Sequence, residues 1–127
     1  MEHILYSDGN FNNISWVIQT NETVTSQSRK HVENHKNKIT KIQSKYVALH
    51  TALFWGIGTF IIKNEDSIKI KLDEKIMHEQ LKLKIMTEDD FIKNKIKFIQ
   101  MFIRQRKLKV EFEIINLENN LATKELE

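Results

Sequence analysis

The chain has 127 residues, of which 40% are hydrophobic and 29% are charged, and its formal net charge is +3. This length supports one hydrophobic core but not two, so we expect a single domain over residues 1–127, and no apolar stretch approaches the roughly 20 residues of a membrane-spanning helix. The absence of cysteine excludes a disulfide framework and thiolate metal sites and fits an intracellular, reducing compartment, while the weak positive charge does not by itself indicate nucleic-acid binding.

The N-terminal quarter of the chain is expected to form three antiparallel strands. β-Branched and aromatic residues cluster in short runs over residues 3–7, 15–20 and 23–31. Turn-forming residues separate these runs at Asp8-Gly9-Asn10 and at Asn21-Glu22. The first strand therefore pairs with the second, and the second with the third.

A long helix is expected from about residue 38 to residue 56. Its apolar residues recur at steps of three and four and so lie on one stripe: Ile39, Ile42, Tyr46, Leu49, Leu53 and Ile57. Glycines at positions 56 and 58 end this helix. Residues 59–64 then form a short, almost wholly apolar run, which is typical of a strand buried on both faces.

The remaining segments are expected to add helices and one more strand. Residues 67–86 predict a short helix and an irregular connection, and Thr87 is placed to cap a second long helix with acidic residues in its first turn. Residues 110–115 predict the last strand, and residues 118–126 a short terminal helix. The whole order predicts an α/β fold with a five-stranded mixed sheet, in the strand order 3-2-1-4-5, flanked by helices.

Four short segments carry a recognisable series of motifs: Ile4–Asn10, Lys45–Leu49, Ile61–Ser67 and Glu118–Lys124. The series resembles that of ribonuclease H-like domains of the reverse-transcriptase type. That family has a strand ending in (T/S)DG(S/N), a helix opening with E-Y-x-A-L, a strand ending in DS, and a last motif R-E-x-N-x-x-A-D. Asp8 and Asp66 match its acidic positions, whereas Lys45 falls on its glutamate and Lys124 on its final aspartate. The resemblance implies this fold for nearly the whole chain.

The resemblance also implies a catalytic site at these four positions. In active members the four carboxylates hold two Mg²⁺ ions that activate a water and stabilise the leaving oxygen of a phosphodiester. An ammonium has no lone pair for a metal, and two aspartates with two lysines sum to zero charge. We therefore expect Lys45 to bridge Asp8 and Asp66 in place of a metal, Lys124 to close the network, and no cofactor to bind.

An active site with altered ligands is the alternative, with Asp8 and Asp66 binding Mg²⁺. Other carboxylates could then complete the set: Glu125 or Glu127 by a slip of the last motif, or Glu65 or Glu22 by leaning into the site. His78 lies loosely where active relatives carry a loop histidine, but a structural histidine is the simpler interpretation.

A basic segment precedes and opens the long helix, with Arg29, Lys30, Lys36, Lys38 and Lys41. A solvated charged face explains it most simply, but phosphate contacts are the functional alternative. In the resemblance, several amides lie beside the site where relatives contact the sugar-phosphate backbone: Asn10, Asn12, Asn13 and Gln43. Nucleic-acid binding is therefore expected to involve these amides together with Lys36, Lys38 and Lys41.

Three functions remain open on this basis. The first is a catalytically inactive ribonuclease H-like module that binds RNA or an RNA–DNA hybrid, or serves as a structural subunit of a larger complex. The second is an active Mg²⁺-dependent ribonuclease H that cleaves the RNA of RNA–DNA hybrids. The third is a subunit that contacts only proteins. A fold alone does not separate them.

Overall fold

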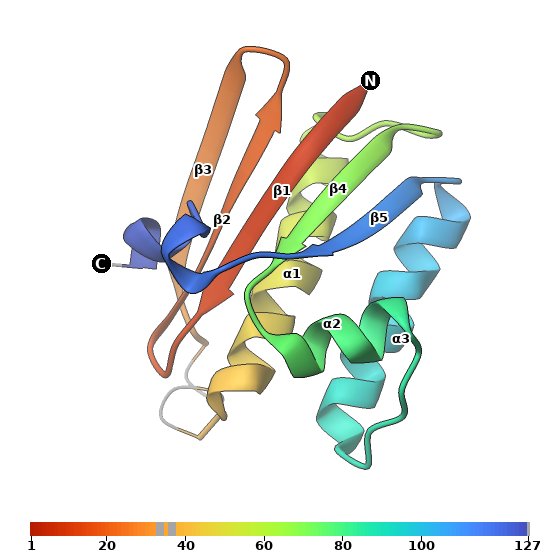
Figure 1. Cartoon of the computed structure of the whole chain (residues 1–127). Helices are drawn as coiled ribbons and strands as arrows, with labels where there is room; N and C mark the ends of the chain where they lie inside the picture. The colour runs from red at the N-terminus through yellow and green to blue at the C-terminus, as the bar shows by residue number, and fades with distance from the viewer. Residues whose placement is uncertain (33–34, 36–37, 127) are drawn as a thin grey trace.

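The computed structural model describes residues 1–32, 35 and 38–126. One sheet contains all five strands: β1 (Glu2–Gly9), β2 (Asn13–Thr20), β3 (Thr23–Lys30), β4 (Ser67–Leu72) and β5 (Lys109–Ile114). The strand order is β3-β2-β1-β4-β5 (Figure 1). Strands β1, β2 and β3 pair antiparallel, whereas β4 pairs parallel with both β1 and β5. The predicted mixed sheet and its order are confirmed.

Three α-helices pack with this sheet: α1 (Lys41–Gly58), α2 (Lys75–Lys82) and α3 (Asp90–Gln105). Helix α1 packs on β1 and β2, α3 packs on α1, and α2 packs on β4 and β5 (Figure 1). The chain ends in two short 3-10 turns, η1 (Leu117–Asn119) and η2 (Thr123–Leu126), rather than in the expected helix over residues 118–126. Turn η2 lies against β1, β2 and β3.

Helix α1 has the buried stripe expected from its sequence. Tyr46, Leu49 and Leu53 are fully buried and join one core with Leu5, Trp16 and Ile70 from the sheet. Its N-terminus is closed by a capping box, in which the Thr40 hydroxyl accepts from the Gln43 backbone and the Gln43 side chain accepts from the Thr40 backbone. The box satisfies two backbone donors that a helix start leaves unpaired.

The fourth strand is not where the apolar run suggested. Residues 59–64 form the turn that ends α1, since the backbone N–H groups of Phe60 and Ile61 donate to the carbonyls of Ile57 and Gly56. Strand β4 is the alternating segment after it, with Ile68, Ile70 and Leu72 buried. As a consequence Asp66 lies just before β4, and the carboxylate that directly follows β4 is Asp73.

The second long helix also begins later than predicted. Asp89 rather than Thr87 caps α3, because its side chain accepts from the backbone N–H groups of Phe91 and Ile92. Thr87 instead accepts from the Asp89 N–H, just before the helix. Residues 75–82, expected to be partly irregular, form α2.

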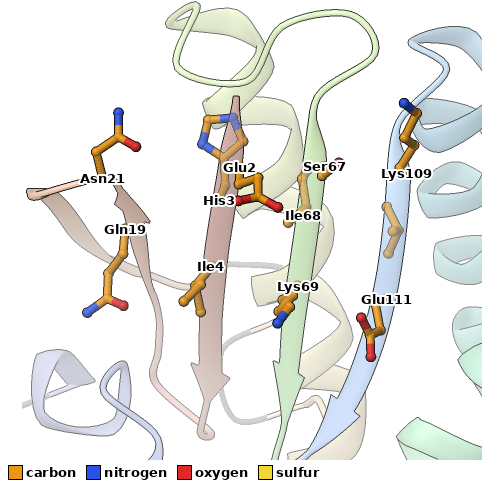
Figure 2. A pocket seen from close by; sticks show the side chains of 11 residues that line it. Glu2, His3, Ile4, Gln19, Asn21, Ser67, Ile68, Lys69, Lys109 and Glu111 are labelled. Carbon is orange, nitrogen blue, oxygen red and sulfur yellow. The ribbon is translucent and has the colours of Figure 1, made fainter.

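The sheet face away from α1 carries many polar side chains. Figure 2 shows Glu2, Gln19, Lys69 and Glu111 on this face, with the helices behind the strands. They help to line a shallow pocket of about 560 Å³. None of the helices in the described part of the chain is long and apolar enough to cross a membrane.

Candidate functional site

The candidate site lies at the end of the sheet where the parallel strands β1 and β4 finish. Asp8 is near the end of β1, and Asp73 directly follows β4. Because parallel strands present their carboxyl ends at the same edge, the two carboxylates lie side by side there. Helix α1 approaches this edge so closely that a Cβ at Gly9 would lie 2.7 Å from the Ser44 backbone. This glycine therefore lets the next residue of α1, Lys45, reach both aspartates.

The Lys45 ammonium lies between the carboxylates. Its Nζ is 2.6 Å from Asp73 Oδ1, 3.3 Å from Asp8 Oδ1 and 3.8 Å from Glu74 Oε1. The lysine side chain is only 4% exposed. Burial alone lowers the pKa of Lys45, but the hydrogen bond to Asp73 and the three nearby negative charges outweigh burial and raise it. Lys45 is therefore a fixed cation at neutral pH.

Neutral groups donate further hydrogen bonds to both carboxylates. The Gly9 N–H donates to Asp8 Oδ1 at 2.8 Å, and the Thr123 hydroxyl donates to Asp8 Oδ2 at 2.7 Å. The Asn120 amide donates to Asp73 Oδ2 at 2.9 Å and to the Ser7 carbonyl at 3.0 Å. Each of the four carboxylate oxygens thus has a protein donor, counting Lys45 on Asp73 Oδ1. This network joins β1, β4, α1 and the C-terminal turns.

Comparison with known proteins identifies the architecture. No protein-family model and no curated protein sequence matches the chain. Among solved structures, RNase H1 of the halophilic archaeon Halobacterium salinarum NRC-1 matches 97% of this chain and 94% of its own, with a TM-score of 0.68 and 15% identity. LC11-RNase H1 in complex with an RNA/DNA hybrid matches 96% of this chain and 91% of its own, with a TM-score of 0.74 and 21% identity. This chain has a ribonuclease H-like fold.

A viral structure has the same fold. The foamy viral protease-reverse transcriptase in complex with dsDNA matches 97% of this chain and 88% of that chain, with a TM-score of 0.59 and 14% identity. At identities this low, structural similarity shows the ribonuclease H-like fold alone and does not show the activity. The site chemistry of this chain must therefore be assessed on its own.

The donor set at this end does not fit a pair of Mg²⁺ ions. Such ions need several oxygen ligands with free lone pairs, and an ammonium in their place offers none and repels them. Here Lys45 stands between the two aspartates, and each aspartate oxygen already accepts a hydrogen bond. In the described residues, no three His, Cys, Asp or Glu side chains are grouped so that they could hold a metal ion.

Asp66 does not belong to this site, contrary to the sequence prediction. Its Oδ2 lies 2.7 Å from His3 Nε2 and accepts from the Lys63 N–H at 2.8 Å, while Oδ1 lies 3.3 Å from the N-terminal ammonium of Met1. The five residue steps of β1 from His3 to Asp8 correspond to roughly 17 Å. Asp66 therefore anchors the opposite end of the sheet. Lys45 bridges Asp8 to Asp73 instead.

The last motif is also displaced by one residue. In the ribonuclease H-like pattern the aspartate directly follows the alanine, and Ala122 is followed by Thr123. It is Thr123 that contacts Asp8, whereas Lys124 is exposed. The sequence therefore identifies Thr123 as the site residue only if the motif is aligned on Ala122. Asp73 was missed because the fourth strand was expected over residues 59–64 rather than over Ser67–Leu72.

The alternative carboxylates do not complete the site. Glu22 lies in the turn between β2 and β3, and Glu65 lies beside Asp66, so both are at the opposite end of the sheet. Glu125 is exposed in η2, and Glu127 lies outside the described residues. Glu74, which the sequence did not suggest, is the third carboxylate near Lys45. His78 is half-buried in α2.

The amides expected to contact nucleic acid serve local structure. Asn10 Oδ1 accepts from the backbone N–H groups of Asn12 and Asn13, and so closes the turn after β1. The Asn13 side chain donates to the Leu126 carbonyl at 3.1 Å. Gln43 takes part in the capping box and donates to Asp89 at 2.9 Å. Asn12 alone among these four is exposed, and the side chains of the other three form hydrogen bonds within the fold.

The basic segment gathers at the same end of the sheet as Asp8. Arg29 and Lys30 pair with Ile14 and Asn13, which are adjacent in β2 to the strand end that carries Asp8. Lys38 and Lys41 lie just before and at the start of α1, and all four cations are exposed. Arg29 also lies over the Trp16 ring, 5.2 Å from its centroid. Lys36 is outside the described residues.

Proposed function

We propose that the chain is a catalytically silent ribonuclease H-like module that binds nucleic acid within a larger assembly. The observation that carries this proposal is the Lys45 ammonium, held 2.6 Å from Asp73 and 3.3 Å from Asp8 in the place where the resemblance expects metal. An internal cation neutralises the carboxylates permanently. It cannot activate a water or stabilise a leaving oxygen as two Mg²⁺ ions would.

Binding without cleavage is supported by what remains around the site. Arg29, Lys30, Lys38 and Lys41 surround the Asp8 end of the sheet, where their charges can neutralise phosphates. Helices α1 and α3 also begin at this end, joined by the hydrogen bond from Gln43 to Asp89, so the positive ends of both dipoles point the same way (Figure 1). LC11-RNase H1 is a structural neighbour in complex with an RNA/DNA hybrid, which supports a hybrid as the ligand.

Restoring carboxylates tests whether Lys45 replaces the metal. The double variant Lys45→Glu/Thr123→Asp places four carboxylates around the site, with Asp8 and Asp73 already present. We expect calorimetry to detect Mg²⁺ binding in this variant but not in the parent. Mg²⁺ should also raise the thermal unfolding midpoint of the variant, because a ligand that binds only the folded state stabilises it.

The control for that experiment is Lys45→Gln/Thr123→Asn, which has similar side-chain sizes without the new charges. It should bind no Mg²⁺. The proposal is wrong if the parent chain cleaves the RNA of a hybrid in Mg²⁺ and Asp8→Asn abolishes that cleavage. This outcome would establish an active nuclease with an altered ligand set.

A salt titration tests nucleic-acid binding. The variant with alanine at Arg29, Lys30, Lys38 and Lys41 should bind an RNA–DNA hybrid more weakly than the parent. Its slope of log affinity against log salt should flatten by roughly 0.9 for each phosphate contact removed. Lys69→Ala/Lys97→Ala, which removes exposed cations elsewhere, is the matched control and should bind like the parent. Absence of binding by the parent at low salt would leave a role in protein assembly alone.

A further inference from the structure

The opposite end of the sheet has a pocket that the proposed function does not use. Helices α1 and α3 both finish there, beside the start of β1 (Figure 1). The pocket has a volume of about 540 Å³ and is lined by Ile57, Gly58, Phe60, Ile62, Lys63, Asn64 and Arg106. We call it the Phe60 pocket. Its volume lies within the range of roughly 300–1,000 Å³ that is usual for small-molecule sites.

Phe60 combines an unfavourable backbone conformation with an exposed aromatic side chain. It has a φ of 64° and follows the C-cap of α1, where glycine is the preferred residue. The residue is 78% exposed. The corresponding residues after α2 and α3, Lys84 and Lys107, have φ values of 57° and 54° but carry side chains that suit water. Folding therefore gives no reason for a phenylalanine at position 60.

Two cations accompany this ring in the pocket. Lys63 and Arg106 are exposed and line the same pocket as Phe60. In the described part of the chain, neither forms an ion pair with a carboxylate. Their charges are therefore available to an anion, and Asn64 adds an amide that can both donate and accept.

The backbone around the pocket is held in place before any ligand arrives. The Glu65 N–H donates to the Arg106 carbonyl at 2.8 Å, which joins the end of α3 to the loop after α1. The Lys63 N–H donates to Asp66 at 2.8 Å. A preorganised pocket loses less conformational entropy on binding, so few contacts suffice for useful affinity.

We propose that the Phe60 pocket binds a nucleotide unit, with its base stacked on Phe60 and its phosphate held by Lys63 and Arg106. A flat exposed ring offers stacking to any base, and paired cations recognise phosphate. A protein ligand is less well matched, because the pocket is small and carries two cations, whereas the core of a protein interface is broad and depleted of charge. The unit is a free nucleotide or one residue of a single strand, and the ligands tested below separate these two sources.

Nuclear magnetic resonance titration of the full chain tests the proposal with adenosine monophosphate, a short oligoadenylate, adenosine and ribose 5-phosphate. Adenosine monophosphate or the oligonucleotide should shift the signals of Phe60, Lys63 and Arg106. Adenosine and ribose 5-phosphate each lack one half of the recognised group and should bind roughly tenfold more weakly. Tighter binding of the oligonucleotide identifies a strand as the ligand, and equal or weaker binding identifies a free nucleotide.

Two variants remove the site in different ways. Phe60→Gly removes the stacking ring and should reduce affinity roughly tenfold without lowering the thermal unfolding midpoint. Gly58→Met adds a side chain at a position that lines the pocket and should block binding, and the fold accommodates it because a Cβ at Gly58 meets nothing within 4 Å. Phe54→Ala removes an exposed phenylalanine that lies in α1 and outside the pocket; it is the matched control and should bind like the parent.

The proposal is overturned if Phe60→Gly binds adenosine monophosphate and the oligonucleotide as tightly as the parent does, or if neither ligand shifts the pocket signals. Equal binding of ribose 5-phosphate would reduce the site to a nonspecific anion patch and also overturn it. The variant lacking Arg29, Lys30, Lys38 and Lys41 should retain this binding. Failure at the Asp8 end is therefore distinguishable from failure here.

Discussion

The Lys45 site and the Phe60 pocket lie at opposite ends of the sheet and differ in the exposure of their cations. At the Asp8 end, Lys45 is buried among carboxylates, and every oxygen of Asp8 and Asp73 accepts a hydrogen bond. At the Phe60 end, Lys63 and Arg106 face solvent beside an exposed aromatic ring. A complete internal network stabilises the fold, and the four oxygens of Asp8 and Asp73 are already bonded within it. Groups that the fold does not use are the better guide to ligand binding.

The largest effect is expected from breaking the network at the Asp8 end. Lys45→Ala leaves Asp8 and Asp73 buried and close together without a cation, which should lower the free energy of unfolding by about 3–5 kcal/mol. Urea denaturation at pH 7 measures this loss. Lys41→Ala in the exposed first turn of α1 should change stability by no more than about 0.5 kcal/mol. Similar losses for both variants would refute the proposed dependence of the carboxylates on Lys45.

A smaller loss is expected at the opposite end from Asp66→Asn. The change weakens charged hydrogen bonds with His3 and Lys63, and should cost about 1–3 kcal/mol. Burial alone raises the pKa of Asp66, but the hydrogen bonds from His3 and the Lys63 backbone and the N-terminal ammonium lower it overall. The stability that depends on its charge is therefore present above its unfolded pKa of about 4 and lost as the pH falls below it.

The measurement for Asp66 is urea denaturation between pH 7 and pH 2, roughly the range over which a carboxylate of lowered pKa becomes protonated. The stability of the Asp66→Asn variant should depend less on pH than that of the parent does. Glu65→Gln, at the exposed neighbouring position, is the control and should keep the parent's pH dependence. A parallel pH dependence in the parent and the Asp66→Asn variant would show that Asp66 is not the titrating group.

Between the two ends, His50 should make the α1–α3 contact sensitive to acid. Its ring stacks on Phe98 and Phe102, and burial together with the nearby Lys95 ammonium lowers its pKa to about 4. The unfolded chain binds the proton first, so stability should fall as the pH drops from about 6.5 to 4. The loss should be about 1–2 kcal/mol, since solvent reaches part of the ring.

His50→Gln should remove this acid sensitivity, as measured by chemical denaturation at pH 7 and at about pH 4.5, between the two pKa values. His78→Gln, at a half-buried position in α2, provides the control. If His78→Gln removes the sensitivity and His50→Gln does not, the α1–α3 contact is not its source.

The smallest effect is a gain at the Phe60 end. Phe60→Gly relieves the left-handed backbone and should raise the free energy of unfolding by up to about 1 kcal/mol. Phe54→Gly, within helix α1, should instead lower it by about 1 kcal/mol or more. Urea denaturation of both variants gives the comparison. A loss of stability in Phe60→Gly would mean that the ring packs within the fold rather than serving a ligand.

The fold could be predicted from the sequence because periodicity reports directly on burial. The three-and-four spacing through Tyr46, Leu49 and Leu53 and the alternating strands fix the sheet and α1. The fourth strand was wrongly predicted over residues 59–64, because their apolar composition suggested a buried strand although they lack the alternation of a strand. The fourth strand is instead the alternating run from Ile68 to Leu72, and the carboxylate that follows it is Asp73 rather than Asp66.

The site was less predictable because its contacts join distant segments. The resemblance to the ribonuclease H-like motifs implied that Lys45 lies next to Asp8, and the structure brings them within 3.3 Å. Thr123 is marked only by the alanine before it, and no periodicity marks Asn120 as a hydrogen-bond donor, because both residues lie in or beside short 3-10 turns. The Phe60 pocket was missed for a similar reason, since its lining comes from two helix ends and a loop.

Arg29 connects the proposed binding surface to the interior. Its guanidinium lies over Trp16, a fully buried ring whose Nε1–H has no hydrogen-bond partner among the described residues. A phosphate that draws Arg29 away would forfeit a cation–π contact of about 0.5–1 kcal/mol and change the surroundings of the indole. Nucleic-acid binding would then be recorded in the intrinsic tryptophan emission, so the chain carries its own optical reporter of an occupied surface.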